Sequence, residues 1–181
     1  GTRWEITGLE LDGTKISYTD SGTLGAGDLS LMRYFYTLTL GVNNSSYGSV
    51  SPTSLIVPNN NTTYSTSGAT LTLKDGRKAT ASVKNITGYT TKFSSWSSAS
   101  GTIVKATTVN ANFTRTANTY TIAFNGNGAT GGSTASMSMT YDQAKNLTAN
   151  GFTKTGYTFT GWNAKADGTG TAYADKAVVK N

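Results

Sequence analysis

The side chains that most often carry out enzyme chemistry are absent or isolated in this chain. It contains no Cys and no His, which removes thiolate nucleophiles, imidazole bases and the usual zinc ligands. Its nine carboxylates are scattered, and neither Asp75 nor Asp142 has a partner at the defined separation that a glycosidase requires. Asp12, Asp167 and Asp175 stand near turn-forming residues, where capping of the backbone is expected and calcium binding is the alternative. We predict that the protein is not an enzyme and has no catalytic residue, metal site or cofactor.

A basic cluster is the strongest candidate for binding chemistry. The 181-residue chain has a net charge of +6. Four cations surround one predicted hairpin: Lys74, Arg77, Lys78 and Lys84. Such a cluster attracts polyanions, for example wall polymers or acidic glycans, by simple electrostatics. Specific nucleic-acid binding is not expected, because few aromatic residues stand among the basic ones. Two interpretations stay open, a solvated face and a polyanion-binding surface.

We expect β-strands to position these candidates, because apolar and polar residues alternate along most of the chain. The alternation is clearest at residues 36–40, 79–83 and 109–113. A period of two is typical of strands in antiparallel sheets with one wet face. The Asp and Gly at positions 75 and 76 predict a tight hairpin turn. Residues 142–147 predict one or two helical turns, and little other helix is expected.

A repeated sequence pattern divides the chain. Residues 36–40 (YTLTL) return as 120–124 (YTIAF), and residues 88–96 (GYTTKFSSW) return as 156–162 (GYTFTGW). Two related β modules in tandem explain this repetition most simply. With a boundary in residues 114–118, we predict three segments: an extended or hairpin segment at 1–35, and modules at 36–117 and 118–181.

Aromatic residues at matching places in the two modules are predicted to be structural. The rings of Trp96 with Tyr89, and of Trp162 with Tyr157, are able to stack on sugar faces. Their equivalent places in both repeats favour packing within each module instead. The full set of repeat aromatics is Tyr36, Tyr89, Trp96, Tyr120, Tyr157 and Trp162.

The stretch GFTKTGYTFTGWNAKADGTGTAYAD, residues 151–175, resembles a known repeat. Its run GYTFTGW, with the Gly and Tyr that follow, is similar to the core of the Listeria-Bacteroides repeat, also called the internalin B-repeat. The resemblance covers residues 118–181, and residues 36–117 resemble a divergent form. It implies small β-grasp-like modules strung in arrays on exported bacterial and some archaeal surface proteins, often adhesins, and it implies no catalytic activity. We therefore expect a mainly β protein of tandem small β-sandwich or β-grasp-like modules.

One departure from the family pattern concerns the end of the second module. Members of the family usually continue past the position of residues 173–180 with a linker and a closing strand, whereas the last residue here is Asn181. We expect either a fragment or a module that lacks its last strand and has an open sheet edge. An open edge is a template on which another strand can pair.

Residues 1–35 supply a candidate for that pairing strand. They carry a net charge of −2, whereas residues 36–117 carry +6 and residues 118–181 carry +2. Donation of residues 3–18 to the next copy would give a head-to-tail filament. The residues expected to fill the groove are Trp4, Ile6, Leu9 and Leu11. A short hairpin around residues 12 and 13, packed on the first module, is the alternative.

The sequence thus predicts a non-enzymatic extracellular protein of the cell surface that serves as a structural or adhesive repeat. Its expected partners are other copies of itself or neighbouring repeats. A glycan-binding or polyanion-binding adhesin module that uses the basic cluster is the alternative. No membrane insertion is expected, because no run approaches the ~20 apolar residues of a membrane helix. The export signal and the surface anchor are expected outside the given sequence.

Overall fold

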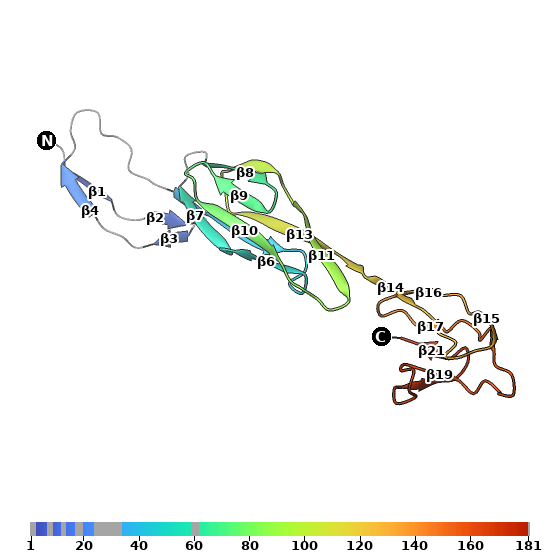
Figure 1. Cartoon of the computed structure of the whole chain (residues 1–181). Helices are drawn as coiled ribbons and strands as arrows, with labels where there is room; N and C mark the ends of the chain where they lie inside the picture. The colour runs from blue at the N-terminus through green and yellow to red at the C-terminus, as the bar shows by residue number, and fades with distance from the viewer. Residues whose placement is uncertain are drawn as a thin grey trace. The chain divides into compact units, whose positions relative to one another are not determined.

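The structure, a computed structural model, places most of the chain in β-strands (Figure 1). It describes residues 3–6, 9–11, 14–16, 20–23, 34–58 and 62–180, with side-chain surroundings from residue 35 onward. The chain divides into two compact units. We call them unit 1 (Gly1–Ile86 and Thr91–Arg115) and unit 2 (Thr87–Thr90 and Thr116–Asn181).

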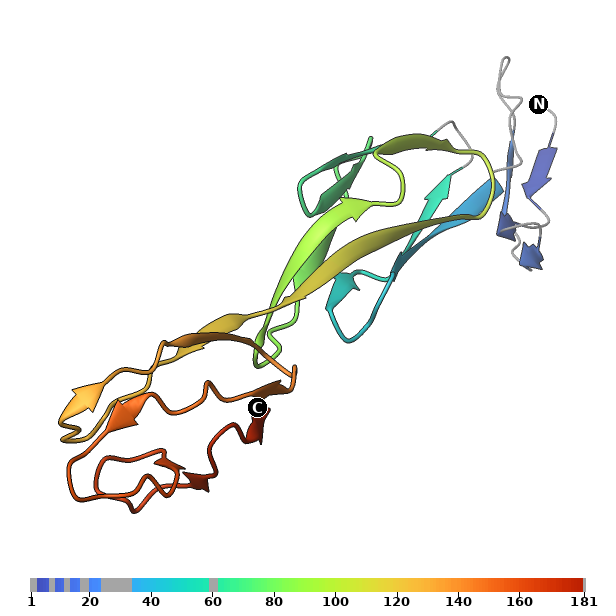
Figure 2. The same ribbon diagram turned by 90° about the vertical axis from the view of Figure 1, so that its right-hand side faces the viewer.

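Unit 1 is a sandwich of two β-sheets (Figure 1, Figure 2). One sheet has five strands in the order β12 (Ser100–Ile103), β8 (Thr62–Ser67), β9 (Thr70–Leu73), β10 (Lys78–Val83) and β6 (Gly48–Ser51). The other has the order β11 (Tyr89–Trp96), β13 (Thr107–Ala117), β5 (Tyr34–Val42), β2 (Leu9–Leu11) and β3 (Thr14–Ile16), with β7 (Ser54–Pro58) against β5. A separate ladder joins β1 (Arg3–Ile6) to β4 (Asp20–Thr23).

The core of unit 1 lies between its two sheets, because strands of both sheets contribute to one cluster of buried side chains. The period of two in the sequence explains which residues enter it, since successive side chains of a strand point to opposite faces. On β13 the buried residues are Val109, Ala111 and Phe113, and on β10 they are Ala79 and Ala81. The alternation therefore sets the inner face of each strand.

Two strands of this sandwich, β5 and β13, run parallel and side by side. Their register pairs Thr107 with Leu38 and continues to the pair of Ala111 with Val42. The period of two in the sequence predicted antiparallel sheets, whereas the β5–β13 and β2–β5 pairs are parallel. Parallel strands need a long connection, and here all of the intervening strands supply it.

Asn43 continues this ladder with its side chain. Its Nδ2 donates to the carbonyl oxygen of Phe113 at 3.0 Å, and the amide nitrogen of Phe113 donates to its Oδ1 at 2.9 Å. The backbone nitrogen of Asn43 donates to the carbonyl of Ala111 at 3.1 Å. We call this arrangement the Asn43 clasp. It satisfies both backbone groups of Phe113, the residue whose ring is buried in the core.

The predicted hairpin at residues 75 and 76 is confirmed. Strand β9 pairs with β10 in antiparallel fashion, with Thr72 opposite Lys78. Gly76 has a φ of 89°, a conformation that favours glycine, and the Asp75 carboxylate accepts a hydrogen bond from the amide of Arg77 at 3.0 Å. The turn residues therefore fix the hairpin locally.

Unit 2 is built from short two-stranded ladders. The first is β14 (Thr119–Ile122) with β16 (Met137–Thr140), and the second is β15 (Gly131–Gly132) with β18 (Phe152–Thr153). The others are β17 (Lys145–Asn146) with β21 (Val178–Val179), and β19 (Trp162–Asn163) with β20 (Ala172–Tyr173). All four ladders are antiparallel.

The core of unit 2 is small. Among the described residues, Met137, Met139 and Leu147 form its buried cluster, with half-buried residues such as Tyr120 and Trp162 packed against them. A core of this size buries little apolar surface, so we expect it to stabilise the unit less than the core of unit 1 does.

The expectation of a mainly β fold is confirmed, whereas that of helical turns at residues 142–147 is wrong. The described residues contain no helix. Asp142 has a φ of 64°, outside the right-handed helical region, and Lys145 and Asn146 pair with β21 instead. Tertiary pairing outweighs the weak helical periodicity at this place.

Candidate functional site

The four strand-donation residues lie on two strands that are already paired within the chain. Trp4 and Ile6 belong to β1, which pairs with β4. Leu9 and Leu11 belong to β2, which pairs with β3 in antiparallel fashion and with β5 in parallel fashion. Donation of these strands to another copy would therefore be an exchange of pairing partners.

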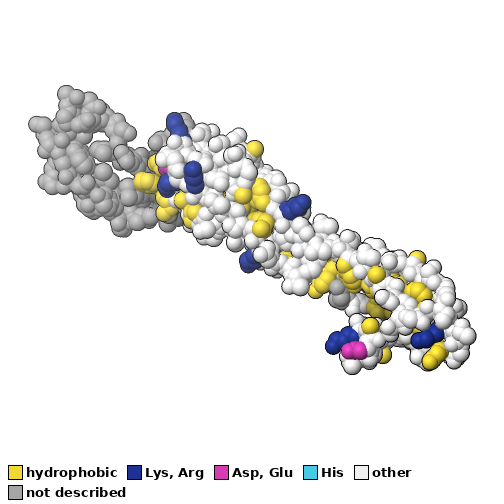
Figure 3. Space-filling model, viewed as in Figure 1, with side chains coloured by type: hydrophobic (Ala, Val, Ile, Leu, Met, Phe, Trp, Pro, Cys, Tyr) yellow, Lys and Arg dark blue, Asp and Glu magenta, His cyan; other side chains and the backbone are white. Residues whose placement is uncertain are grey.

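The four cations of the basic cluster are not gathered at one place. Lys74, Arg77 and Lys78 lie at the β9–β10 turn, whereas Lys84 follows the opposite end of β10. With about 3.3 Å per residue along a strand, the six residues of β10 put roughly 20 Å between its ends. Figure 3 shows several Lys and Arg side chains near one end of unit 1 and others scattered over the described surface.

Two of these cations are held by bonds within unit 1. Arg77 donates from Nε and Nη2 to Asp75 Oδ2 at 2.9 and 2.7 Å, and from Nη1 to the carbonyl of Ile56 at 2.9 Å. The hydrogen bond from this guanidinium lowers the pKa of Asp75. Lys84 donates to the carbonyl of Ser45 at 2.9 Å. Among the described residues, Lys74 and Lys78 are the two cations of the cluster whose side chains make no bond to a carboxylate or a carbonyl.

The repeat aromatics of unit 1 serve packing. Trp96 is only 7% exposed, and its Nε1 donates to the backbone carbonyl of Gly68 at 3.1 Å. The Phe93 ring packs against it at a centroid distance of 5.8 Å. Tyr36 on β5 is half-buried against the same core. Trp96 therefore has both its ring and its N–H satisfied, and it offers no open face for a sugar.

Tyr89, which belongs to unit 2, packs on Tyr141 of the same unit. The rings meet edge to face at 5.2 Å, and Gly88 lies so close to the Tyr141 ring that a Cβ at this position would overlap it. The Tyr89 hydroxyl donates to Asp142 Oδ2 at 3.3 Å, and Lys180 pairs with the other oxygen of Asp142 at 2.8 Å. The hydrogen bond to Asp142 raises the pKa of Lys180.

Trp162, the repeat counterpart of Trp96, lies in a different environment. Three rings surround it: Phe124 at a centroid distance of 4.6 Å, Phe159 at 4.9 Å and Phe152 at 6.2 Å. Its Nε1 is buried and has no hydrogen-bond partner among the described residues. A buried donor without a partner is costly, typically by about 1–3 kcal/mol. Trp162 is therefore packed but incompletely satisfied.

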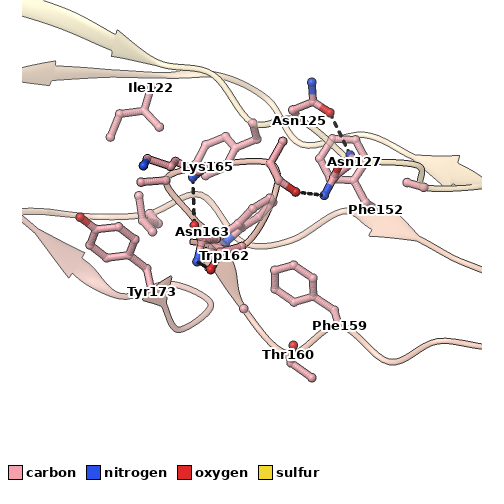
Figure 4. A pocket seen from close by; sticks show the side chains of 18 of the residues that line it. Ile122, Asn125, Asn127, Phe152, Phe159, Thr160, Trp162, Asn163, Lys165 and Tyr173 are labelled. Atoms are coloured by element: carbon pink, nitrogen blue, oxygen red, sulfur yellow. Dashed lines mark hydrogen bonds between the residues drawn. The ribbon is translucent and has the colours of Figure 1, made fainter. Parts of the chain in front are cut away.

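An open groove with a volume of about 1090 Å³ runs past Trp162 (Figure 4). We call it the aromatic groove. Its lining includes residues of β14 and the segment after it, Tyr120, Ile122 and Phe124, and the strongly exposed Tyr157, which is 73% accessible. In Figure 4 the side chains of Ile122, Phe152, Phe159 and Tyr173 surround Trp162. Exposed apolar surface of this kind in a concave site is typical of a binding surface.

The charged side chains that line the aromatic groove are lysines, one of which, Lys180, is paired with Asp142. Lys154, Lys165 and Lys180 line it, and none of its described lining residues is an Asp or Glu. The side-chain amide of Asn163 is fully used in hydrogen bonds within its own loop. Its Nδ2 donates to the carbonyls of Gly168 and Gly170, and its Oδ1 accepts from the amides of Lys165 and Gly170. The groove thus combines an aromatic floor with a positive rim.

The isolated carboxylates cap the backbone, as expected for residues near turns. Asp167 Oδ1 accepts bonds from the amide and hydroxyl of Thr169 at 2.9 and 2.8 Å, and these bonds lower the pKa of Asp167. Asp175 Oδ1 accepts from the amide of Asn150 at 2.8 Å. Asp12 lies outside the described residues. Within the described residues, no three acidic side chains converge as a metal site would require.

Tyr120, Tyr157 and Trp162 were singled out from the sequence, but Phe124, Phe152 and Phe159 were missed. Phe124 is far in sequence from Phe152 and Phe159, so no local period brings the three rings together. A usable signal was the density of aromatic residues after position 150, where GYTFTGW places three rings within seven residues. The Asn43 clasp was also missed, because it joins residues 70 positions apart.

Comparison with known families supports the resemblance seen in the sequence. Residues 120–181 match the Listeria-Bacteroides repeat domain. This is a family of repeat domains of surface proteins, and such domains are generally non-enzymatic. No curated protein and no solved structure matches the chain. No helix long and apolar enough to cross a membrane occurs in the described part of the chain.

Proposed function

Because residues 120–181 are a Listeria-Bacteroides repeat domain, we propose that this chain is part of an extracellular surface protein and works as a load-bearing structural repeat. In this role unit 1 resists extension, and residues 36–117 act as the divergent form of the repeat. No bond-making chemistry is needed, in keeping with the absence of Cys and His from the sequence.

The observation that carries this proposal is the parallel ladder between β5 and β13. Tension that enters unit 1 at the start of β5 and leaves at the end of β13 pulls the two strands in opposite directions along their length. In this geometry the five paired positions from Leu38 to Val42 are loaded together in shear, rather than one after another. The Asn43 clasp adds two hydrogen bonds at the end of the ladder.

Single-molecule force spectroscopy tests the role directly. The chain contains no Cys, so one cysteine at each end of unit 1 provides unambiguous points of attachment. Pulling through Phe35→Cys and Arg115→Cys loads the parallel ladder in shear, and we expect a high unfolding force. Asn43→Ala in the same geometry should lower that force, because the clasp is lost.

The control changes only the direction of pull. Attachment through Asp75→Cys and Arg115→Cys loads the β9–β10 hairpin from its turn, where the bonds break in succession. We expect a clearly lower force in this geometry. Equal forces in the two geometries would overturn the proposal that the parallel ladder bears load.

Assembly of copies into a filament is a second candidate function. It is favoured by the short ladders of unit 2, in which β14 pairs with β16 and, among the described residues, with no other strand. Size-exclusion chromatography at several concentrations, with residues 1–35 present or deleted, tests it. A shift to larger species only when residues 1–35 are present supports assembly, and an equal monomer in both samples contradicts it.

The geometry favours polyanion binding less than either of these roles. Arg77 is paired with Asp75, and Lys84 lies at the far end of β10 from the other three cations. An exposed cation already bonded within its own unit attracts a polyanion less than a free one does. The adhesin alternative therefore depends mainly on Lys74 and Lys78.

A further inference from the structure

Unit 2 contains the tripeptide Gly-Tyr-Thr twice, at residues 88–90 and at residues 156–158. We call these the first tip and the second tip. Their backbones match at the glycine, since φ is 78° at Gly88 and 79° at Gly156, a left-handed conformation that favours this residue. Two segments with the same sequence and the same local backbone offer the same chemical groups to a neighbour.

The first tip is engaged at all three of its residues. The carbonyl of Gly88 accepts a hydrogen bond from the amide of Asn118 at 2.9 Å, and the hydroxyl of Thr90 donates to Asn118 Oδ1 at 2.7 Å. Between them, the ring of Tyr89 meets the ring of Tyr141 edge to face at 5.2 Å. The tip is therefore recognised by its backbone, its hydroxyl and its aromatic ring together.

The residues that hold the first tip form one surface, which we call the socket: Asn118, Tyr141 and Asp142. Asn118 and Tyr141 lie at the same end of the β14–β16 ladder, where the amide of Tyr141 donates to the carbonyl of Asn118 at 2.8 Å. Asp142 comes next and accepts the hydrogen bond of the Tyr89 hydroxyl. All three residues follow position 117, so the first tip is held by the repeat that comes after its own sequence pattern.

The same groups of the second tip are open. Among the described residues, no hydrogen bond involves the carbonyl of Gly156, the hydroxyl of Tyr157 or the hydroxyl of Thr158. The Tyr157 side chain is 73% accessible, whereas Tyr89 is half-buried. The ammonium of Lys154 lies 4.7 Å from the centre of the Tyr157 ring and covers part of one face. The rest of the second tip faces solvent.

The space beside the two glycines shows the same difference. A Cβ at Gly88 would overlap the ring of Tyr141, whereas a Cβ at Gly156 would meet nothing within 4 Å. In the first tip this space is occupied by a socket residue, and not by a strand of the repeat that carries the tip. The partner that the second tip lacks is therefore a socket.

We propose that the second tip is a docking surface for another repeat unit, one that carries an Asn, a Tyr and an Asp at the positions of Asn118, Tyr141 and Asp142. Tip and socket join one repeat to the next by the same contact each time, so that each repeat is coupled to its neighbour. This inference rests on the structural-repeat role proposed above, and it names the partner of the repeat.

The socket belongs to the kind of repeat found in unit 2. Strands β5 and β7 of unit 1 align with β14 and β16 through their matching pairs. On this alignment the socket positions of unit 1 hold Tyr34, Asn59 and Asn60, of which the last two lie outside the described residues. The sequence of unit 1 thus has no side-chain amide at the first position and no carboxylate at the last. The partner is a repeat like unit 2, and not unit 1 of a second copy.

A contact between one tip and one socket is small, so tethering contributes to it. A short connection between two repeats holds their surfaces at an effective concentration of roughly millimolar. A dissociation constant of about 1 mM or less between separate chains is therefore sufficient for docking within an array. Binding this weak requires a method that detects fast exchange.

An NMR titration of full chains tests the docking. The donor is the ¹⁵N-labelled unmodified chain, whose own socket is filled by its first tip. The acceptor is the unlabelled double variant Tyr89→Ala with Tyr157→Ala, in which the socket is vacant and no second tip competes. We expect the amide resonances of residues 156–158 of the donor to shift progressively as the acceptor approaches about 1 mM.

The matched control is an acceptor with Tyr157→Ala alone, whose socket stays filled by Tyr89. It differs from the test acceptor at one residue and should leave the resonances of residues 156–158 in place. Reversed labelling identifies the other side of the contact. The amides of residues 118, 141 and 142 in a labelled acceptor should shift when the unmodified chain is added, but not when the Tyr157→Ala chain is added.

A second acceptor guards against loss of the fold of unit 2, since Tyr89→Ala removes a half-buried ring. Gly88→Ala with Tyr157→Ala keeps every socket side chain and displaces the first tip, because the added methyl group overlaps the Tyr141 ring. Dispersed methyl resonances of Met139 and Leu147, which belong to the core of unit 2, show that an acceptor is folded.

The outcomes separate docking from the load-bearing role. Shifts at residues 156–158 that require a vacant socket support the proposal. No shift with either vacant acceptor, or equal shifts with the filled one, overturns it. The force measurements on unit 1 do not involve the tips, so a failure of docking leaves the role of the parallel ladder standing. A low unfolding force in shear likewise leaves the docking standing.

Discussion

Unit 1 and unit 2 carry related sequence patterns, yet only unit 1 encloses its tryptophan completely. Trp96 is 7% exposed and bonded to Gly68, whereas Trp162 lies half-buried beside an open groove with its N–H unpartnered. The pattern that places the ring is therefore not what closes the core. The two units also differ in strand pairing, because β5 is paired by β13, whereas among the described residues β14 pairs with β16 alone.

The same difference appears in the size of the two cores. In unit 1 the buried cluster draws on both sheets, and Leu38, Leu71 and Ile103 are fully enclosed. In unit 2 the buried cluster holds two methionines and a leucine. Methionine fills irregular space but specifies packing weakly. We therefore expect unit 2 to be the less stable and more adaptable of the two.

Removal of one phenyl ring from each unit should give the largest difference between the units in the loss of unfolding free energy. Phe113→Ala empties a buried site in unit 1 and should lower its free energy of unfolding by about 3–5 kcal/mol. Phe159→Ala in unit 2 removes a ring that is 39% exposed and should cost about 1 kcal/mol, because much of its surface already faces water. Differential scanning calorimetry of each full-chain variant measures both. Similar losses would show that the groove of unit 2 is closed in solution.

Replacement of each repeat tryptophan by phenylalanine should give a smaller difference in the loss of unfolding free energy. Trp96→Phe removes the donor of the Gly68 carbonyl together with part of a ring, and we expect a loss of about 2–4 kcal/mol. Trp162→Phe makes the same chemical change but breaks no hydrogen bond among the described residues, so the loss should be about 1 kcal/mol. Urea unfolding followed by circular dichroism distinguishes them. An equal loss at both sites would mean that the Trp162 N–H has a partner in solution.

The ion pairs of the two units should respond to opposite ends of the pH scale. The folded-state pKa of Asp75 is lowered by its bond to Arg77, so its contribution is present above pH ~4 and is lost as pH falls through that lowered pKa. The pKa of Lys180 is raised by Asp142, so its contribution is present below pH ~10.4 and is lost as pH rises through the raised pKa. Both pairs are exposed, and the Asp75 pair should be worth less than ~1 kcal/mol.

Asp75→Asn and Asp142→Asn provide the check on those pH effects. Melting temperatures measured across the pH range should converge with those of the unmodified chain for Asp75→Asn once the pH falls below the lowered pKa of Asp75. For Asp142→Asn the convergence should come at high alkaline pH. Convergence at the opposite end of the range in either variant would contradict the assigned cause of the pKa change.

Substitution of the basic cluster should change polyanion binding only slightly, which is the smallest of the expected effects. Lys74→Ala with Lys78→Ala removes the two cations of the basic cluster that are least engaged within unit 1, and should lower the salt concentration for elution from a heparin column only slightly. Lys145→Ala with Lys176→Ala in unit 2 is the matched control. A large decrease for the unit 1 pair alone would show that the β9–β10 turn is a polyanion site after all.

Local features of this fold could be predicted from the sequence. The alternation at residues 79–83 and 109–113 gave the strands and their buried faces, because a strand's two faces follow directly from a period of two. The Asp75 and Gly76 turn was predictable for the same reason, since its bonds lie within two residues. The repeat core GYTFTGW was sufficient to indicate the family.

Non-local features could not be predicted in this way. The parallel pairing of β5 with β13 depends on a register between distant segments, and no single window of sequence contains it. The basic cluster was proposed from nearness in sequence, but β10 separates Lys84 from Lys78 by its whole length. The helical turns expected at residues 142–147 were wrong because pairing with β21 decides the local conformation. In each case a partner far along the chain determines the outcome.

The pairing of β5 with β13 also sets the order in which unit 1 can fold. The Asn43 clasp joins residues 70 positions apart, so the ladder cannot close before nearly all of unit 1 is available. Contacts of such long sequence separation form slowly, because the entropy of closing the loop is lost before the pairing is gained. A chain that emerges from a narrow exit with its N-terminus first would keep one edge of β5, at Leu38–Val42, unpaired until β13 follows. Unit 1 therefore completes its fold only once β13 is free to pair.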